Sequence, residues 1–480
     1  MGSMGENDSA AIQEQPNMAE SKVVEDDEMY QDVMSQFSFL NGYTNMVVGF
    51  QLAPDISQDT IVAAIRAGVD KLIAEVPWIG WQVIAVPGKP GTSDTLKPAP
   101  WPADSVNEIV RVKDCTGLMP SLAKLERAGV PIRMLDGKVL SPFPSLPEPH
   151  GIVGPVPIVA IQINFIEGGL MISFSANHII IDGTGIAQLA RLLAFVMNDA
   201  EIPADEVAQA NRDRSRVVPL IPRGEPVKDY EHMRRPAGWK PQPPASPLIW
   251  SYFKLPYSGL ATLMRSVGAS SSSLQSPQLV SENDVMCALY WQRVTVVRLG
   301  KGFAPDTVST FTRAIDARTA VGVPFTYLGH LVHFATTRFA MGQLASLPVL
   351  TVAQALRRDL NAVNTSWAVR SYATFLAREP DRSQLIYGGK RDPNIDVAST
   401  SSVIGMGDSR EATSTVSNSW GPFLGTLRFV RRPNVAHLPA SFQIYPVENG
   451  AIPLLTSLTE DDLNLLKKDP VWRQYTRFVG

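Results

Sequence analysis

A histidine and an aspartate stand four positions apart in the segment His178-Ile-Ile-Ile-Asp182-Gly183. Residues 169–177, which precede it, are apolar enough for a buried strand, and the apolar residues from Ile186 to Met197 have helical spacing. A histidine at a strand end, with an acid four residues later, can be held in one tautomer and act as a general base. Because no nucleophilic side chain accompanies the pair, this chemistry suits the direct transfer of an activated acyl group.

The spacing alone does not establish a catalytic site. The chain has 6 histidines among 480 residues, and aspartate is common, so one His-x3-Asp match arises readily by chance. The alternative is a histidine with satisfied hydrogen bonds at a strand end, followed by an aspartate that caps the next helix. Such a cap is compatible with a structural role beside an active site, so the choice depends on the rest of the chain.

The composition is that of a soluble globular protein large enough for two domains, with 45% hydrophobic and 19% charged residues. A net charge of −3 argues against a nucleic-acid partner. Cys115 and Cys287 are too few for a disulfide framework or a thiolate metal site. Neither a signal peptide nor a run of about 18 apolar residues occurs, so we expect a cytoplasmic protein without a membrane span. We also expect a monomer.

Several common enzyme signatures are missing from the sequence. It contains no Gly-x-Ser-x-Gly elbow, no Walker loop and no Gly-x-Gly-x-x-Gly dinucleotide turn. A serine hydrolase, a P-loop kinase and a dehydrogenase therefore have no support.

Periodicity and turn residues predict the elements of the first half. An acidic, polar composition predicts a disordered tail over residues 1–30. Ser57 is placed to cap a helix, and residues 87–105, rich in Pro, Gly and Ser, are expected to form a surface loop. Strands are expected over 47–52, 81–86, 158–165 and 170–174, the last two as a hairpin.

A proline-rich crossover divides the chain. The 8 prolines between residues 215 and 248 prevent a regular helix or a full strand ladder. We therefore expect an N-terminal lobe over 31–214, a linker over 215–248 and a C-terminal lobe over 249–480. Both halves mix strands and helices, which indicates an α/β (α+β) fold.

The second half begins a helix at Ser281-Glu-Asn-Asp284, which has the residues of a capping box. Strands are expected over 250–254, 308–315 and 331–336, and helices over 257–267, 350–363 and 366–377.

The flanking motifs carry more information than the pair alone. Over nearly all of residues 34–476 the chain resembles the BAHD-type and fungal trichothecene O-acetyltransferase-like acyltransferases. The similar segments, in chain order, are Asn177-His178-Ile-Ile-Ile-Asp182-Gly183-Thr-Gly185, Ser281-Glu-Asn-Asp284 through Trp291, Asp316-Ala-Arg318, Tyr327-Leu-Gly-His330, Trp420-Gly-Pro-Phe-Leu-Gly425, Phe429-Val-Arg-Arg-Pro433 and Leu458 through Trp472.

The resemblance implies two chloramphenicol-acetyltransferase-like lobes, each a mixed sheet with covering helices, and an active-site tunnel between them. His178 would take a proton from the acceptor, which attacks the thioester carbonyl of acyl-CoA, so acyl-CoA is a co-substrate and no cofactor stays bound. Asp182 would turn away from the imidazole and pair with an arginine, for which Arg318 is the candidate. Gly183 would permit close backbone approach.

The sequence departs from the family pattern in two places. Plant members carry Asp-Phe-Gly-Trp-Gly, whereas this chain has Ser417-Asn-Ser-Trp420-Gly421 without an acid, so its loop must be held without an ionic tie. The motif Tyr-x-Gly-Asn ends here in His330. The residues expected to line the substrate and CoA channel are Ser401, Ser402, Trp420 and Gly421.

Other candidate ligands are less specific. His330 and His333 stand three apart on a predicted strand end and so point to opposite faces, which argues against a metal site. The pairs Arg431-Arg432 and Arg234-Arg235 either meet the phosphates of CoA or are ordinary solvated charge, and the sequence leaves both open.

The expected function is therefore acyl-CoA-dependent O-acylation, with an acetyl or other short acyl group, of a hydroxyl on a small, fungal-type secondary metabolite. Two alternatives stay open. One is a transferase that takes its acyl group from a carrier-protein thioester. The other is a non-transferring member that templates a cyclisation or isomerisation, for which the missing acid at 417–421 is the support.

Overall fold

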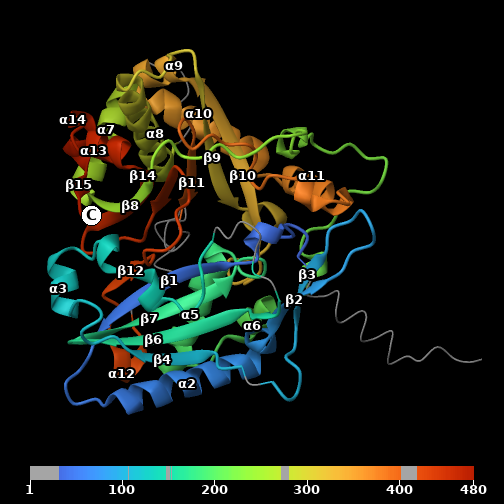
Figure 1. Cartoon of the computed structure of the whole chain (residues 1–480), viewed down its shortest axis with the longest axis vertical. Helices are drawn as coiled ribbons and strands as arrows, with labels where there is room; N and C mark the ends of the chain where they lie inside the picture. The colour runs from blue at the N-terminus through green and yellow to red at the C-terminus, as the bar shows by residue number, and fades with distance from the viewer. Residues whose placement is uncertain (1–31, 106, 147–151, 153, 272–279, 402–418) are drawn as a thin grey trace, which may run out of the picture.

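The computed structural model of this chain describes residues 32–105, 107–146, 152, 154–271, 280–401 and 419–480. Its helices and strands form two lobes, each built on a sheet (Figure 1). The tail expected over residues 1–30 lies outside the described residues.

A five-stranded sheet forms the first lobe. Its strand order is β12-β1-β7-β6-β4. The strands are β1 (Tyr43–Gln51), β4 (Val110–Asp114), β6 (Val159–Ile166), β7 (Gly169–Asn177) and β12 (Phe429–Arg431). β6 and β7 are the predicted hairpin, with Ile166 opposite Gly169. Gly168 makes its turn at φ +74°, a conformation that favours glycine.

Two helices, α2 (Gln58–Glu75) and α5 (Gly183–Met197), pack on each other and lie along this sheet, as Figure 1 shows. The predicted cap of α2 is present, because Oγ of Ser57 accepts a hydrogen bond from the backbone N–H of Thr60 at 3.1 Å. α5 follows directly from the His178 turn, so its first residues fix where that turn sits.

A seven-stranded mixed sheet forms the second lobe, in the order β10-β9-β11-β13-β14-β8-β15. Its strands are β8 (Leu248–Pro256), β9 (Val308–Asp316), β10 (Val332–Ala340), β11 (Val397–Ser401), β13 (Ser441–Ile444), β14 (Ala451–Thr459) and β15 (Arg477–Phe478). The long helices α8 (Glu282–Gly300) and α10 (Val349–Val363) pack together against it. α8 begins with the predicted capping box between Ser281 and Asp284.

The remaining helices are α3 (Leu122–Arg127), α4 (Gly137–Leu140), α6 (Ala204–Ala210), α7 (Tyr257–Ser271), α9 (Met341–Ser346), α11 (Ser366–Arg378), α12 (Gly421–Leu424), α13 (Glu460–Leu466) and α14 (Pro470–Tyr475). The predicted helices over 257–267, 350–363 and 366–377 match α7, α10 and α11.

A small third sheet corrects one expectation. Its strands are β2 (Gln82–Val86), β3 (Thr95–Ala99) and β5 (Val156–Pro157), in the order β3-β2-β5. Part of the predicted loop over 87–105 is therefore strand β3. The Pro, Gly and Ser content of the segment indicated a loop, but proline is tolerated in a strand at the edge of a sheet, and β3, which contains Pro98, is such a strand.

The linker over 215–248 is irregular apart from short 3-10 turns and the start of β8. It nevertheless packs firmly, since buried Tyr230 donates a hydrogen bond from its hydroxyl to the carbonyl of Ala368 at 2.9 Å. The chain also crosses between lobes a second time. β12 pairs with β1, with Val47 opposite Arg431.

The expected assignment of all residues after 248 to the C-terminal lobe is therefore too simple. β1 would otherwise be an unpaired edge, and a distant strand covers it.

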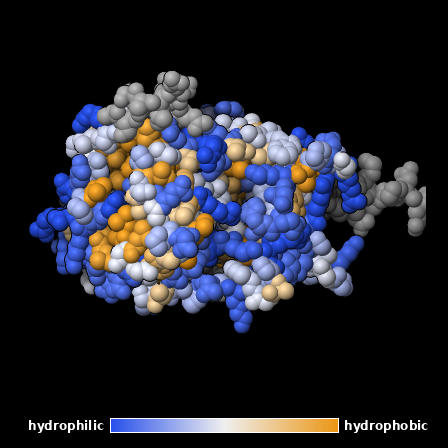
Figure 2. Space-filling model, turned by 90° about the horizontal axis from the view of Figure 1, so that it is seen from above, coloured by the Kyte–Doolittle hydropathy of each residue, from blue (hydrophilic) through white to orange (hydrophobic). Residues whose placement is uncertain are grey.

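The two lobes share hydrophobic core. Tyr327, Leu328 and Tyr372 from the second half pack in the same buried cluster as Phe174 and Ile181 from the first. A bridge between Ile181 and Gly329 ties the lobes at this junction. On the face seen in Figure 2, apolar residues gather on one side of a mainly hydrophilic surface. Within the described ranges, no helix has the length and apolar character needed to cross a bilayer.

Candidate active site

His178 is the first residue after β7 and begins a tight turn that ends at Asp182. Its backbone N–H donates to the carbonyl of Gly42 at 2.9 Å. The preceding residue, Asn177, is anchored by its side chain to Asn41 at 2.8 Å and accepts from the N–H of Ile179 at 3.1 Å. The sheet and this asparagine pair thus fix the position from which the histidine ring projects.

The His178 ring has a defined tautomer. Its Nδ1 lies 3.1 Å from the carbonyl oxygen of Ile181. A carbonyl oxygen only accepts, so Nδ1 carries the hydrogen and Nε2 keeps its lone pair. Burial lowers the pKa of His178, with the Ile181 hydrogen bond and Asp182 acting in the opposite direction. The ring is half-buried and neutral at neutral pH, which suits a proton acceptor at Nε2.

Asp182 has both of the roles weighed from the sequence. Its Oδ1 caps α5 by accepting from the N–H of Gly185 at 2.8 Å. Its carboxylate also receives Nη1 and Nη2 of Arg318 at 2.9 and 3.0 Å, and the N–H of Leu331 at 2.9 Å. Burial opposes its ionisation, but Arg318 and these donors bring the pKa of Asp182 down to about 2.

Arg318 comes from the segment after β9 and is the predicted partner of Asp182. Its side chain is fully buried, and it also donates to Asp316 at 3.0 Å and to the carbonyl of Gly329 at 2.7 Å. One guanidinium from the second lobe therefore braces the His178 turn of the first lobe.

Three further residues support the turn, and sequence reasoning missed their role. Arg214 donates to the carbonyl of Ile180 at 2.7 Å and pairs with Asp32 at 3.3 Å. Nδ1 of His330 donates to the carbonyl of His178 at 2.9 Å. Arg214 and Asp32 belong to no recognisable motif and are distant from the turn along the chain. Of the three residues, only His330 was marked in the sequence, because it replaces the asparagine of Tyr-x-Gly-Asn.

Close backbone approach occurs at Gly185, which corrects the expectation for Gly183. Nothing lies within 4 Å of a Cβ built at Gly183, which is exposed. A Cβ at Gly185 would overlap the carbonyl oxygen of Leu328. The crowding falls on the first turn of α5, where the second lobe packs against it, rather than on the residue next to Asp182.

The residues expected to line a channel do not gather at His178. Trp420 is fully buried between Phe50 and Phe174, at ring-centroid distances of 5.2 and 6.1 Å. Gly421 has φ +77°, and a Cβ there would overlap the carbonyl of Met197 at the end of α5. α5 has 15 residues. It is therefore roughly 22 Å long, which separates its two ends by that distance.

Trp420 and Gly421 are therefore structural. Ser401 ends β11, and Ser402 lies outside the described residues.

Asn198 holds the loop that lacks the family's acid. Its side-chain amide donates to the carbonyl of Ser419 at 2.8 Å, and its oxygen accepts from Oγ of Ser419 and from the N–H of Gly421 at 3.0 and 3.1 Å. Three hydrogen bonds between neutral groups thus hold this loop in the absence of an ion pair. Ser417, where the acid was sought, lies outside the described residues.

The basic pairs are mostly structural. Arg431 is buried and binds Glu448 through two nitrogens at 2.5 and 3.1 Å. Arg432 is buried and donates to Ser145 at 3.1 Å. Arg234 pairs with Glu379 and Glu231. Of these four arginines, only Arg235 is exposed. The expectation of ordinary solvated charge therefore fits this one residue and not the two pairs.

His330 and His333 are both buried, and the described part of the chain contains no cluster of three or more potential metal ligands. His330 belongs to the His178 site. His333 instead packs on Tyr372, with ring centroids 4.7 Å apart.

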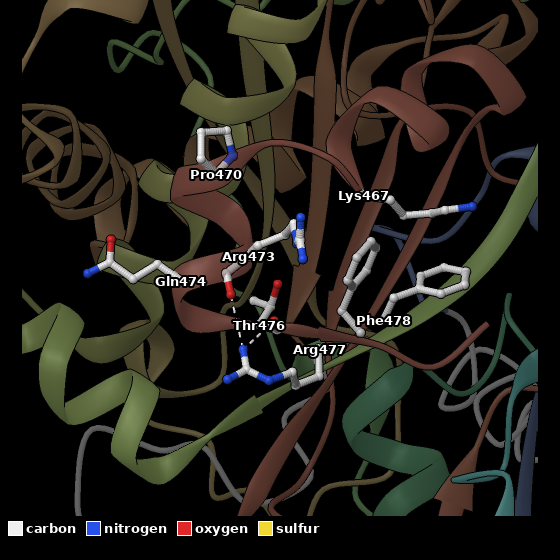
Figure 3. Close-up of a pocket in the computed structure, with 8 residues that line it drawn as sticks. Lys467, Pro470, Arg473, Gln474, Thr476, Arg477 and Phe478 are labelled. Carbon is white, nitrogen blue, oxygen red and sulfur yellow. Dashed lines mark hydrogen bonds between the residues drawn. The ribbon is translucent and has the colours of Figure 1, made fainter.

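A surface pocket of about 620 Å³ lies away from this site (Figure 3). Its walls include Phe253, Lys467, Arg473 and Phe478, and Arg477 turns its guanidinium back onto the carbonyl of Arg473. β15 and β10 are the opposite edges of the seven-stranded sheet, and β10 is the strand that follows His330. The pocket is therefore separate from the residues around His178.

Comparisons with known proteins identify the family. The profile of the trichothecene 3-O-acetyltransferase-like N-terminal domain matches residues 43–195, and that of the Transferase family matches residues 145–410. The chain is 35% identical to O-acyltransferase pigD of Monascus ruber, over 95% of this chain and 100% of that one. It is 35% identical to O-acetyltransferase SAT5 of Stachybotrys chartarum, over 96% and 97%.

A solved structure agrees with the two-lobed architecture. The crystal structure of TRI101 from F. sporotrichioides, complexed with coenzyme A and T-2, superposes with a TM-score of 0.82 at 25% identity, over 94% of this chain and 99% of that one. With matches that run almost end to end, this chain belongs to the Transferase family of acyltransferases, in its trichothecene 3-O-acetyltransferase-like group.

Proposed function

We propose that the protein transfers an acyl group, acetyl or another short chain, from acyl-CoA to a hydroxyl of a small secondary metabolite, with His178 as the general base. The observation that carries this proposal is the hydrogen bond from Nδ1 of His178 to the carbonyl of Ile181, which leaves Nε2 as a neutral base. The names of the relatives and the coenzyme A bound by TRI101 support the donor and the reaction class.

The reaction needs no covalent enzyme intermediate. Nε2 of His178 takes the acceptor's hydroxyl proton as the oxygen attacks the thioester carbonyl. The tetrahedral intermediate then expels the CoA thiolate, which is protonated by the imidazolium of His178. Asp182 and Arg318 bond to each other, to Asp316 and to backbone groups. Their role is to hold the turn in one conformation while the ring changes charge.

The surroundings of the site are part of the same proposal. His178 lies beside the junction of the two lobes, and we propose that the acceptor and the donor approach it between them. We propose that the chain acts as a monomer in the cytoplasm. Both cysteines are buried and unpaired, which suits a reducing compartment. Size-exclusion chromatography with light scattering tests the monomer.

Product mass tests the reaction. The protein is incubated with acetyl-CoA and a panel of secondary-metabolite alcohols, and products are analysed by mass spectrometry with parallel detection of free CoA. We expect an acceptor that gains one acetyl group for each CoA released. An altered acceptor of unchanged mass would instead favour templated isomerisation. Transfer from an acyl-carrier protein but not from acetyl-CoA would overturn the proposed donor.

A further inference from the structure

An aromatic cluster lies beside the His178 site. Tyr387 is at its centre, with ring centroids 5.1 Å from Phe37, 5.4 Å from Phe39 and 4.7 Å from Phe334. Phe37 is buried in the core, whereas the other three rings are half-buried and keep part of their surface exposed. We call Phe39, Phe334 and Tyr387 the aromatic wall.

His330 connects this wall to the candidate base. Its ring centroid is 5.2 Å from that of His178 and 6.3 Å from that of Tyr387. Because its Nδ1 donates to the carbonyl of His178, its Nε2 is left as an acceptor in the neutral ring. The hydroxyl of Tyr387 lies 3.3 Å from that Nε2 and is the group that donates to it. One imidazole thus fixes both the His178 turn and the direction of the Tyr387 hydroxyl.

Two features of the wall distinguish an acceptor surface from a donor surface. The pantetheine arm of CoA, whose thioester end must reach the base, carries amides that need polar partners, whereas the rings around Tyr387 offer apolar faces and edges. Aromatic pairs gain more than the area they bury provides, which favours an aromatic ring over a saturated one on the same carbon skeleton. The aromatic wall is also close to His178, the base that must reach the acceptor hydroxyl, because the ring of His330 lies next to both.

We infer that the aromatic wall binds the acceptor and selects alcohols that carry an aromatic ring, and that His330 is a positioning residue that holds the Tyr387 hydroxyl. This inference rests on the proposed function. It adds a class of acceptor and the residues that select it.

The wall is tested with paired alcohols that have the same carbon skeleton. The probes are 2-naphthalenemethanol and its decahydro counterpart, with acetyl-CoA as donor and release of CoA as the readout. For the wild-type protein we expect kcat/KM to be about 2- to 10-fold higher for the unsaturated probe. Phe334→Leu and Phe39→Leu should bring this ratio close to one and leave the KM for acetyl-CoA unchanged. A ratio that survives both changes, or a rise in the KM for acetyl-CoA alone, would overturn the wall.

Phe478→Leu is the matched control. Phe478 is 46% exposed and packs edge-on against Phe253 at 5.3 Å, but it lies at the opposite edge of the second lobe's sheet from β10. It should leave both KM values unchanged.

Binding without turnover separates this inference from the proposed function. The intrinsic fluorescence of 2-naphthalenemethanol reports its binding to the protein in the absence of any donor. If no transfer occurs but binding weakens in Phe334→Leu, the wall stands and the proposed reaction fails. If transfer occurs but the substitutions change neither the binding nor the ratio of kcat/KM for the two probes, the proposed reaction stands and the inference about the aromatic wall is wrong.

If His330 positions the Tyr387 hydroxyl, substitutions of these two residues should have non-additive effects. Tyr387→Phe keeps the ring and loses the hydroxyl, and His330→Asn keeps a donor for the His178 carbonyl but has no atom at the position of Nε2, which accepts from Tyr387. Each should raise the KM for 2-naphthalenemethanol by about 2- to 10-fold, and the double variant should raise it no further. Additive effects, or a loss of kcat with unchanged KM, would show that His330 acts only on the turn.

Discussion

Arg318 donates to both carboxylate oxygens of Asp182, at 2.9 and 3.0 Å, across the junction of the two lobes. The second residue of the His-x3-Asp motif is thereby directed away from the histidine it follows. His178 takes its orientation from the backbone of Ile181 instead. The motif therefore combines a candidate base and a structural anchor in one short turn.

Removing the anchor's charge should cost stability as well as rate. Asp182→Asn leaves Arg318 buried without its main counter-charge, and we expect a loss of about 3–5 kcal/mol in the free energy of unfolding. Urea denaturation measures the loss. Asp182→Asn combined with Arg318→Met removes both charges and should recover part of it. A single variant as stable as the wild type would contradict the bracing role.

The two glycines of the turn should behave oppositely. Gly185→Ala forces a Cβ onto the carbonyl of Leu328, so we expect a loss of about 3 kcal/mol or displacement of the lobe junction, with activity lost in parallel. Gly183→Ala meets open space at a helical position and should be neutral or stabilising by up to about 1 kcal/mol. Thermal unfolding of the pair checks this. Equal effects would contradict the assignment of the close approach.

Asn198 should matter for stability but not for chemistry. Asn198→Ala removes three hydrogen bonds from the loop at Ser419–Gly421, for an expected loss of about 1–3 kcal/mol. The loop lies at the far end of α5 from His178, so kcat should change less than twofold. A large fall in kcat in the folded variant would place this loop in the catalytic site.

Acid should destabilise the protein through its buried histidines. Burial lowers the pKa of both His330 and His333 to about 3, while the unfolded chain titrates near 6.5. Between these values the unfolded state binds more protons than the folded state, so stability falls as pH falls from about 6.5 toward 3. Each histidine contributes a slope of up to about 1.4 kcal/mol per pH unit.

His333→Phe isolates one of these contributions, because His333 packs against Tyr372 and its ring nitrogens make no hydrogen bond within the described residues. The variant should show a shallower pH dependence of urea unfolding between pH 6 and 4. An unchanged slope would mean that His333 is protonated in the folded protein.

Local patterns predicted much of the fold. The hairpin of β6 and β7, the Ser57 cap and the Ser281 box depend on residues a few positions apart, so their signals survive in the sequence. β12 was missed as a partner of β1 because that pairing joins distant segments. Strand β3 was missed because the Pro, Gly and Ser content of residues 87–105 indicated a loop.

The residues of the candidate site likewise divide into those that the sequence indicates and those that only the folded structure brings to the site. His178, Asp182 and Arg318 were recognisable by motif. Arg214 and Asp32 were not, because Arg214 bonds to the turn from a distant segment and Asp32 acts on it only through Arg214 and the backbone of His330. Trp420 and Gly421 were expected in a channel from the resemblance to the family, but their segment packs at the distal end of α5.

The rate of acyl transfer by His178→Ala tests the central claim most directly. Acetyl-CoA and an acceptor found by product mass are held at saturation, and CoA release is followed in variant and wild type, with thermal unfolding as a check on folding. We expect kcat to fall about 10²- to 10⁴-fold with an unchanged midpoint of unfolding. A folded variant that transfers at the wild-type rate would contradict the role of His178 as the base.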